Sequence, residues 1–254
     1  METIGLIAAM TQESHALLRL IKGQKRISLG PYSGVSFQAG NRICVLITSG
    51  MGIKRASDAA RVLVELASPQ LLISFGIAGA VTTNLQIGDV VVSGKSCLLV
   101  GGIPVRFQPL AILSDVAREA VAEALYHDEA GLYVGTAITT HGSQAILREI
   151  EDMPHPILEM ETAGIAQVAA EHSIPLLSLR SISDGPQAPI PIDLEAAMDE
   201  NDNLRIGSLI AMVLHHPKII FMSARMMRNS RIAANHTALA LIAALNQPLS
   251  LVKG

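Results

Sequence analysis

Aromatic side chains are scarce in this sequence, which has no tryptophan, three tyrosines and four phenylalanines. Charge is also sparse, with 16% charged residues and a formal net charge of -3. Nucleic-acid binders use basic surfaces or stacking aromatics, so this composition argues against a nucleic-acid partner. The two cysteines, Cys44 and Cys97, are too few for a disulfide framework or a four-ligand zinc site, and they favour a reducing compartment.

Long apolar runs are missing as well. Ile206 to Leu214, among the longest, falls well short of the roughly 18 residues that a transmembrane helix needs. The N-terminus has Glu2 where a signal peptide would have a cationic region. Half of the residues are nevertheless apolar and the mean hydropathy is +0.41, which excludes a disordered chain. We expect a soluble, cytoplasmic protein with a large core.

Short apolar runs alternate with helical patterns along most of the chain, which predicts one α/β domain over residues 1–254. Helical periodicity dominates from about residue 204, which predicts a helical C-terminal extension. Runs apolar on both faces indicate a mainly parallel sheet covered by helices. Strands are predicted at Ile4 to Met10, Tyr32 to Gln38, Arg42 to Thr48, Leu71 to Phe75, a run ending at Val90 to Ser93, and Leu176 to Ser183. Helices are predicted at Gln12 to Ile21, Ala56 to Leu66, Ser114 to Leu125 and Met160 to Glu171.

Ligands of open α/β sheets bind beyond the carboxyl ends of the strands. Four segments occupy such places: Met10 to Glu13, Ser49 to Gly52, Gly76 to Gly79, and Asp184. A GxxG sequence after a strand is common, and its glycines are equally well explained by a tight turn into a helix.

Two carboxylates, Glu159 and Glu161, flank Met160 at the start of an apolar helix. They either stabilise the helix dipole or hold sugar hydroxyls in a cleft, and the first explanation is the more common one. Arg180 and Asp184 lie four residues apart on a predicted strand, hence on one face and about 13 Å apart. A nucleoside has a similar length. An arginine between Leu179 and Ile182 is costly to bury without a partner.

Four blocks of the sequence, within residues 4–184, resemble the purine nucleoside phosphorylases and 5′-methylthioadenosine/S-adenosylhomocysteine nucleosidases. The blocks are IGLIAAMTQE from Ile4, SGMGIKRASDAA from Ser49, FGIAGAV with LQIGDVVVS from Phe75, and LEMETAGIAQVAAEHSIPLLSLRSISD from Leu158. The last block is the most specific, because EME and SD occur at the family's spacing. The resemblance implies a twisted, mixed central sheet flanked by helices.

The resemblance also implies roles for individual residues. Glu13 matches the carboxylate that activates water, and Glu161 the one that holds the ribose hydroxyls. Asp184 matches the acid that protonates the purine, and Arg180 the nucleosidases' arginine beside the water. Met160 matches the methionine under the ribose. Glu159, Met10, Met51, Ile77, Ala78, Gly79, Thr140 and Ser183 complete the predicted substrate-binding set.

Hydrolysis and phosphorolysis are the two outcomes that this resemblance allows. Phosphorylases typically supply an arginine and a serine for phosphate where this chain has Ser74 and Ile77. Because Arg180 is present and those ligands are missing, we expect water as the nucleophile, with adenine as the leaving base. Phosphorolysis, with phosphate as co-substrate, remains the alternative; otherwise no cofactor and no metal is expected. Relatives complete each site with a neighbouring subunit, so a homo-oligomer, a dimer or larger, is expected.

The chain departs from the nucleosidase pattern in three segments. In Gly131 to Ile146, Thr139 or Thr140 replaces the phenylalanine that often covers the purine, and the Pro-rich Gly185 to Ile192 replaces a second aromatic. Leu204 to Met227 is basic and rich in methionine, which indicates either a helical cap on the core or a face for peripheral membrane contact. The second interpretation resembles the hopanoid-associated phosphorylase-like proteins and predicts a lipid-linked nucleoside such as adenosylhopane.

One further alternative concerns function itself. A non-catalytic nucleoside-binding or membrane-associated protein is the competing class, and the joint presence of Glu13, Glu161 and Asp184 argues against it. The histidines, including His155 and His236, lack metal-ligand spacing and are interpreted as structural.

Overall fold

The structure is a computed structural model that describes residues 1–140, 150–186, 217–248 and 252–253. Its strands are β1 (Glu2–Ala8), β2 (Lys25–Leu29), β3 (Tyr32–Ala39), β4 (Arg42–Thr48), β5 (Leu71–Ala80), β6 (Val90–Val100), β7 (Ile103–Pro109), β8 (Ala111–Ile112), β9 (Leu132–Thr139), β10 (Pro156–Glu159), β11 (Leu176–Asp184) and β12 (Val252–Lys253). Its helices are α1 (Thr11–Leu18), α2 (Ile53–Ala67), α3 (Asp115–Tyr126), α5 (Thr162–Glu171) and α7 (Pro217–Leu245).

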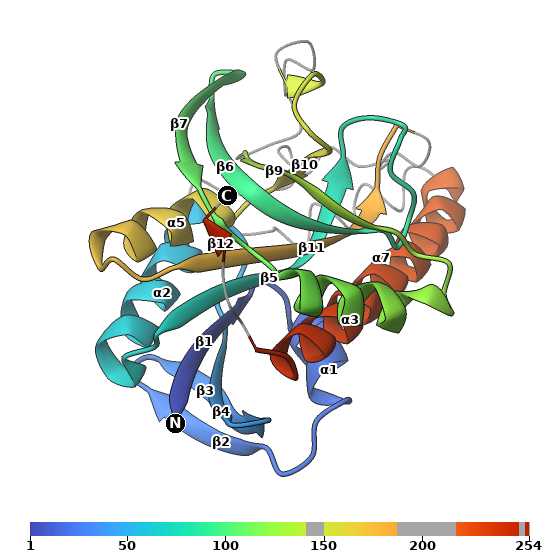
Figure 1. Cartoon of the computed structure of the whole chain (residues 1–254). Coiled ribbons are helices and arrows are strands. Elements are labelled where there is room, and N and C mark those ends of the chain that lie inside the picture. Colours follow the sequence, from blue (N-terminus) through green and yellow to red (C-terminus); the bar gives the residue numbers. More distant parts are fainter. Residues whose placement is uncertain (141–149, 187–216, 249–251, 254) are drawn as a thin grey trace.

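The sheet is mixed, and β5 is its central strand. This strand pairs in parallel with β1 and β11 and antiparallel with β10. Beyond β1, the strands β4, β3 and β2 form an open wing (Figure 1). On the other side, β11, β6, β9 and β10 return to β5, so five strands close into a ring. The mixed sheet that the resemblance implied is confirmed.

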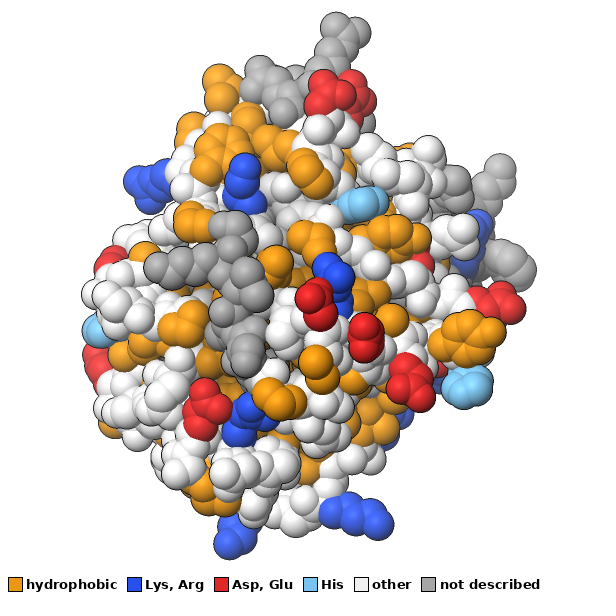
Figure 2. Space-filling view, in the orientation of Figure 1, with side chains coloured by type: hydrophobic (Ala, Val, Ile, Leu, Met, Phe, Trp, Pro, Cys, Tyr) orange, Lys and Arg blue, Asp and Glu red, His pale blue; other side chains and the backbone are white. Residues whose placement is uncertain are grey.

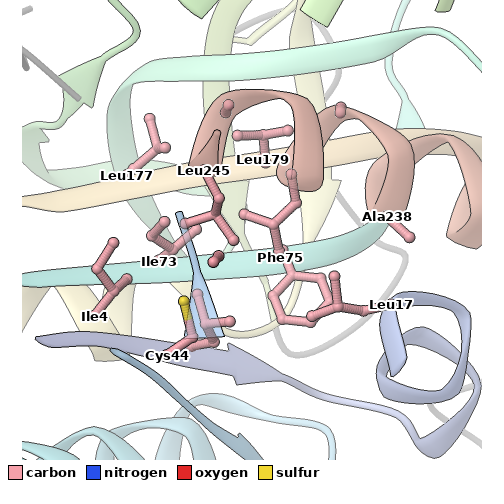
Figure 3. Close-up of a cluster of buried hydrophobic side chains, with 14 of the residues drawn as sticks. Ile4, Leu17, Cys44, Ile73, Phe75, Leu177, Leu179, Ala238 and Leu245 are labelled. Carbon is pink, nitrogen blue, oxygen red and sulfur yellow. The ribbon is translucent and has the colours of Figure 1, made fainter. Parts of the chain in front are cut away.

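Helices cover both faces of this sheet, and each face has its own core (Figure 1). The helices α1, α3 and α7 supply one core, and α2 and α5 supply the other. Strand β1 is buried on both faces: Ile4 and Leu6 belong to the first core and Ile7 to the second. In Figure 3, Leu17 of α1 and Leu245 of α7 pack around Phe75 and Leu179 of the central strands. The single α/β domain expected from the sequence is observed.

The sequence predicted too short a central strand. Leu71 to Phe75 was expected to end before the glycines, but β5 continues to Ala80. Gly76 and Gly79 therefore lie within the strand, and the interpretation of GxxG as a turn into a helix is wrong. Pairing with β11 on one side and with β1 and then β10 on the other explains the extension, because neighbours on both sides satisfy the backbone.

The C-terminal helix is part of the core. Ala234, Ala238 and Leu241 of α7 are buried in the cluster shared with β5 and β11. Residues 204–216 of the predicted extension, including all of Ile206 to Leu214, lie outside the described residues. No helix in the described part of the chain has the length and apolar character needed to cross a bilayer.

Exposed apolar side chains gather at one end of the molecule, over β6 and β7 (Figure 2). Val100, Ile103 and Phe107 are each more than half exposed there. Lys95 lies over the Phe107 ring, 6.0 Å from its centroid.

Candidate functional site

The candidate site is at the edge of the sheet where parallel strands end together. The neighbouring pairs β4–β1, β1–β5 and β5–β11 are all parallel. The segments that follow these four strands therefore meet at one edge of the sheet. Glu13 comes from the start of α1, directly after β1, and Gly52 from the turn after β4. Strand β10 brings Glu159 and Glu161 to the same place.

Glu13 is buried and held by backbone amides on both oxygens. The Met10 N–H donates to Oε2 at 2.7 Å and the Ile77 N–H donates to Oε1 at 2.9 Å. Burial raises the pKa of Glu13, although the charge of Arg180 and these amides act in the opposite direction. The start of a helix favours the ionised form of a carboxylate, but at Glu13 the loss of solvation outweighs this effect. A raised pKa suits a group that must accept a proton near neutral pH.

Glu159 and Arg180 form a fully buried ion pair. The Nη2 group of Arg180 donates to Glu159 Oε2 at 3.1 Å, and Thr162 donates to the same oxygen from its backbone and hydroxyl, both at 2.8 Å. Thr139 Oγ1 donates to the other oxygen. Burial opposes ionisation of Glu159, but Arg180 and these hydrogen bonds lower its pKa overall. Both oxygens of Glu159 are thus engaged by protein groups, which makes it a support for Arg180.

Glu161 has fewer partners and a different ionisation. The Gly52 N–H donates to its Oε1 at 3.1 Å, and Arg180 Nη2 lies 3.6 Å from its Oε2. Burial, followed by the neighbouring charge of Glu159, raises the pKa of Glu161 to about 7. Its carboxylate is the less engaged of the pair and can accept hydrogen bonds from a ligand.

Arg180 has donors to spare in this buried cluster. Its Nη2 also donates to Ser74 Oγ at 2.8 Å. Its Nε and Nη1 are buried and have no hydrogen-bond partner among the described residues. A buried guanidinium with unused donors is expensive unless something binds to them. The sequence expectation that a buried Arg180 requires a partner is confirmed by Glu159.

Asp184 lies in a separate hollow of about 270 Å³, lined also by Thr82, Gln86, Ile182 and Arg225. Ser183 Oγ donates to Asp184 Oδ1 at 2.6 Å. Burial raises the pKa of Asp184, and the Ser183 hydrogen bond partly opposes that shift. The protonated form that a general acid needs is therefore favoured.

The strand β11 is irregular before Asp184. Its register with β5 shifts between Ile182 and Asp184, so that Asp184 pairs with Gly79. Arg180 pairs with Gly76, and it is not among the charges that shift the pKa of Asp184. The same-face argument from regular alternation fails at this point, because the bulge interrupts the period-2 pattern.

The remaining predicted residues differ in exposure. Met10, Met51, Met160, Ile77, Gly79 and Thr140 are half-buried, whereas Ala78 and Ser183 are buried. The Thr140 N–H donates to the Glu159 carbonyl at 2.9 Å. Of the two options at that position, Thr139 is buried and its hydroxyl donates to Glu159, whereas Thr140 is half-buried.

Sequence reasoning did not predict two residues that donate hydrogen bonds to the carboxylates, Gly52 and Thr162. Thr162 was treated only as part of a helix. Gly52 was placed in a candidate ligand-binding segment, Ser49 to Gly52, but its N–H was not predicted to donate to Glu161. A threonine at the first position of a helix, directly after two glutamates, is a signal for hydrogen bonding to them. The contact from Gly52 crosses 109 residues, so no local pattern could reveal it.

A second hollow, of about 1000 Å³, lies between α1 and strands β2 to β4 and contains none of the predicted site residues. Ser14 and Thr48, whose hydroxyls are 2.6 Å apart, lie on its wall. We do not take this larger hollow as the candidate site, because its lining residues include no buried carboxylate.

Several predicted features fall partly outside the described residues. These are residues 141–146 of the base-covering segment, residues 187–192 of the Pro-rich loop, and residues 204–216 of the basic segment. Within the described ranges, no three His, Cys, Asp or Glu side chains are grouped so that they could hold a metal ion. His236 Nδ1 lies 2.8 Å from the Gly88 carbonyl, a structural contact.

Comparison with family models identifies the match at the level of the superfamily. The model described as the phosphorylase superfamily matches residues 3–214, most of the chain.

Solved structures with the same fold include several nucleosidases. The 5′-methylthioadenosine/S-adenosylhomocysteine nucleosidase of Neisseria meningitidis, in complex with methylthio-immucillin-A, is 21% identical, with a TM-score of 0.68 over 97% of this chain and 99% of that one. The nucleosidase of Colwellia psychrerythraea, in complex with adenine, is 18% identical, with a TM-score of 0.71 over 98% of both chains. Futalosine hydrolase of Helicobacter pylori is 19% identical, with a TM-score of 0.68 over 96% of this chain and 97% of that one. At these identities the likeness shows a common fold.

Proposed function

We propose that this chain, which belongs to the phosphorylase superfamily, hydrolyses the N-glycosidic bond of an adenine nucleoside with a substituted 5′ carbon. One observation supports this most strongly: Glu13, Glu161 and Arg180 converge at the strand edge, and Asp184 lies in a neighbouring hollow. The similarity to nucleosidases of adenosine derivatives and to futalosine hydrolase is consistent with the same reaction class.

The buried carboxylates suit the sugar end of such a substrate. Glu161 accepts hydrogen bonds from the ribose hydroxyls and offsets the positive charge that develops on the sugar as the bond breaks. Glu13, fixed by the Met10 and Ile77 amides, accepts the proton of the attacking water. The unused Nε and Nη1 donors of Arg180 orient groups bound between these carboxylates.

The single carboxyl of Asp184 suits the base end. Cleavage leaves a purine anion, which is a poor leaving group until a proton reaches its five-membered ring. Burial raises the pKa of Asp184, which is the direction that a proton donor needs. The Ser183 hydroxyl fixes the orientation of the carboxyl.

Water is the better nucleophile for this site. A phosphate subsite needs cationic donors that are free to bind the ion. Here the Ser74 hydroxyl is bonded to Arg180, and the side chain of Ile77 offers no donor. Arg180 itself faces three carboxylates, those of Glu13, Glu159 and Glu161, which disfavour a second anion.

Product analysis tests the reaction type. The purified protein is incubated with 5′-methylthioadenosine, S-adenosylhomocysteine or adenosine, with and without phosphate. We expect adenine and a free sugar at the same rate in both buffers, with Glu13→Gln slowed strongly and Glu65→Gln, at an exposed position, unchanged. A sugar 1-phosphate would establish phosphorolysis instead, and binding without turnover would establish a non-catalytic protein.

The lipid-linked substrate stays a finer proposal. It rests on the composition of Leu204 to Met227, of which residues 204–216 are not described. The exposed apolar side chains over β6 and β7 are a second surface that could meet lipid or a neighbouring subunit. Release of adenine from adenosylhopane, compared with methylthioadenosine, tests the proposal; turnover of methylthioadenosine alone would refute it. Sedimentation of the protein tests the proposed homo-oligomer.

A further inference from the structure

Two glycines of β5 lie directly against two of the carboxyl groups that the proposed reaction uses, those of Glu13 and Asp184. A Cβ atom built on Gly76 would overlap Oε1 of Glu13 and would lie 2.7 Å from its Cδ. A Cβ atom built on Gly79 would lie 2.7 Å from Oδ2 of Asp184 and 3.4 Å from its Cγ. Contacts below 3.0 Å are essentially absent between real side chains, so neither carboxylate can stay in place beside an alanine.

The absence of a side chain at Gly76 lets the Glu13 carboxylate lie close to the backbone of β5. Its Oε1 accepts the N–H of Ile77, the residue next to Gly76, so the carboxylate lies flat against the backbone of β5. Withdrawal from a Cβ at position 76 would stretch that hydrogen bond and the one from Met10 to Oε2. The base would then lose both its position and the amides that hold it.

The second contact depends on the bulge in β11. The register shift places Asp184 opposite Gly79, and its Oδ1 is already held by Ser183. Oδ2 can rest against the strand only because position 79 has no side chain. A Cβ there would rotate the carboxyl about the Ser183 hydrogen bond and away from its present orientation.

We propose that Gly76 and Gly79 are positioning residues: the bare backbone of β5 at these two positions sets where Glu13 and Asp184 stand relative to the substrate. The inference rests on the proposed function for its catalytic consequence. Each glycine acts through one carboxylate only, so the two substitutions should impair different steps. Misplacement of a catalytic group by about 1 Å costs on the order of 10²-fold in rate.

The test uses two substrates that differ in the leaving group. Gly79→Ala should lower kcat on methylthioadenosine on the order of 10²-fold, yet leave cleavage of 4-nitrophenyl riboside near the wild-type rate, because nitrophenolate leaves without a proton. Gly76→Ala should slow both substrates, since both need activated water. Gly94→Ala on β6 is the matched control, because its Cβ would meet Ile112 and Val134 at 3.4 and 3.6 Å, which are ordinary contacts.

Double-mutant cycles decide the matter if the riboside is a poor substrate or one variant is unstable. In the Asp184→Asn background, Gly79→Ala should cost less than about twofold, and the same holds for Gly76→Ala in Glu13→Gln, because each glycine acts through its partner. Full, additive losses in these backgrounds, or no loss in the wild type, would overturn the inference. An inactive wild type would refute the proposed function instead, and active wild type with unaffected glycine variants would refute only this inference.

Discussion

The two ends of the candidate site place carboxyl groups in different surroundings. At the sugar end, Glu13, Glu159 and Glu161 are buried around one guanidinium, Arg180. At the base end, Asp184 stands with one hydroxyl partner and no cation among the causes of its pKa shift. Arg180 and several hydrogen bonds lower the pKa of Glu159 despite its burial, whereas the pKa of Asp184 is raised by burial and opposed only by the Ser183 hydrogen bond. The difference between a base and an acid therefore lies in the surroundings.

The largest expected effect is on the base end. Asp184→Asn removes the proposed proton donor, and we expect kcat on a purine nucleoside to fall by about 10² to 10⁴-fold. Adenine release measures the change, with the exposed Asp152→Asn as control. A loss that appears in KM alone would mean that Asp184 binds the base without protonating it.

At the sugar end, an effect of comparable size is expected on the free energy of unfolding. Arg180→Met leaves Glu159 buried without its cation, and we expect the free energy of unfolding to fall by about 3–5 kcal/mol. Arg61→Met, at a half-exposed pair with Glu171, should change it by less than about 1 kcal/mol. Urea unfolding measures both. The double variant Glu159→Gln with Arg180→Met should recover part of the loss, and equal effects at Arg180 and Arg61 would contradict the comparison.

The contribution of Asp184 to the free energy of unfolding should depend on pH. The folded state raises the pKa of Asp184, so its stabilising contribution is present at low pH and is lost as pH rises through the folded pKa. Asp184→Asn should therefore unfold no more easily than the wild type at pH 8, and its advantage should shrink at pH 5. Unfolding curves at the two pH values test this; a variant less stable at pH 8 would contradict it.

The next effect, in order of size, is a shift in the pH profile of activity. Glu161 must be ionised to stabilise the sugar cation, so kcat/KM should rise with pH through about 7. Glu159→Gln removes a negative charge that raises the pKa of Glu161, and the acid limb should move to lower pH. Glu151→Gln, at an exposed position, is the control. An unmoved or raised limb would show that another group controls it.

The smallest effect is expected at Ser183. Its hydrogen bond lowers the pKa of Asp184, so Ser183→Ala should move the basic limb of the pH profile to higher pH. The acid limb, which reports the sugar end, should stay in place. Movement of both limbs together would mean that the two ends are coupled, and the comparison would then have to be abandoned.

Local patterns predicted several of the helices and strands, because each depends on neighbours in the chain. The strands predicted at Tyr32 to Gln38 and Arg42 to Thr48 agree with β3 and β4, and the predicted helix from Ser114 agrees with α3, whose Ser114 side chain accepts from the Ala117 N–H. The strands β2, β7, β9 and β10 were not predicted. The length of β5 and the five-strand ring were missed, since both depend on pairing between distant strands. The very short β8 and the edge strand β12 have too few residues to show a pattern.

The candidate site divides in the same way. The residue types at Glu13, Glu161, Arg180 and Asp184 could be named from motifs. Whether Glu159 faces a substrate could not, because its five hydrogen bonds come from Thr139, Glu161, Thr162 and Arg180 after folding. Nor could the sign of the pKa shift of Glu13, which depends on how much water the fold removes.

The sequence by itself determined the α/β class, the one-domain architecture and the acidic and basic groups available for chemistry, since these follow from periodicity and residue type. Only the tertiary structure decided which carboxylate shares Arg180, which stands alone, and which glycines leave room for them. Those outcomes depend on through-space distance and loss of solvation, and neither is written in the order of residues along a chain.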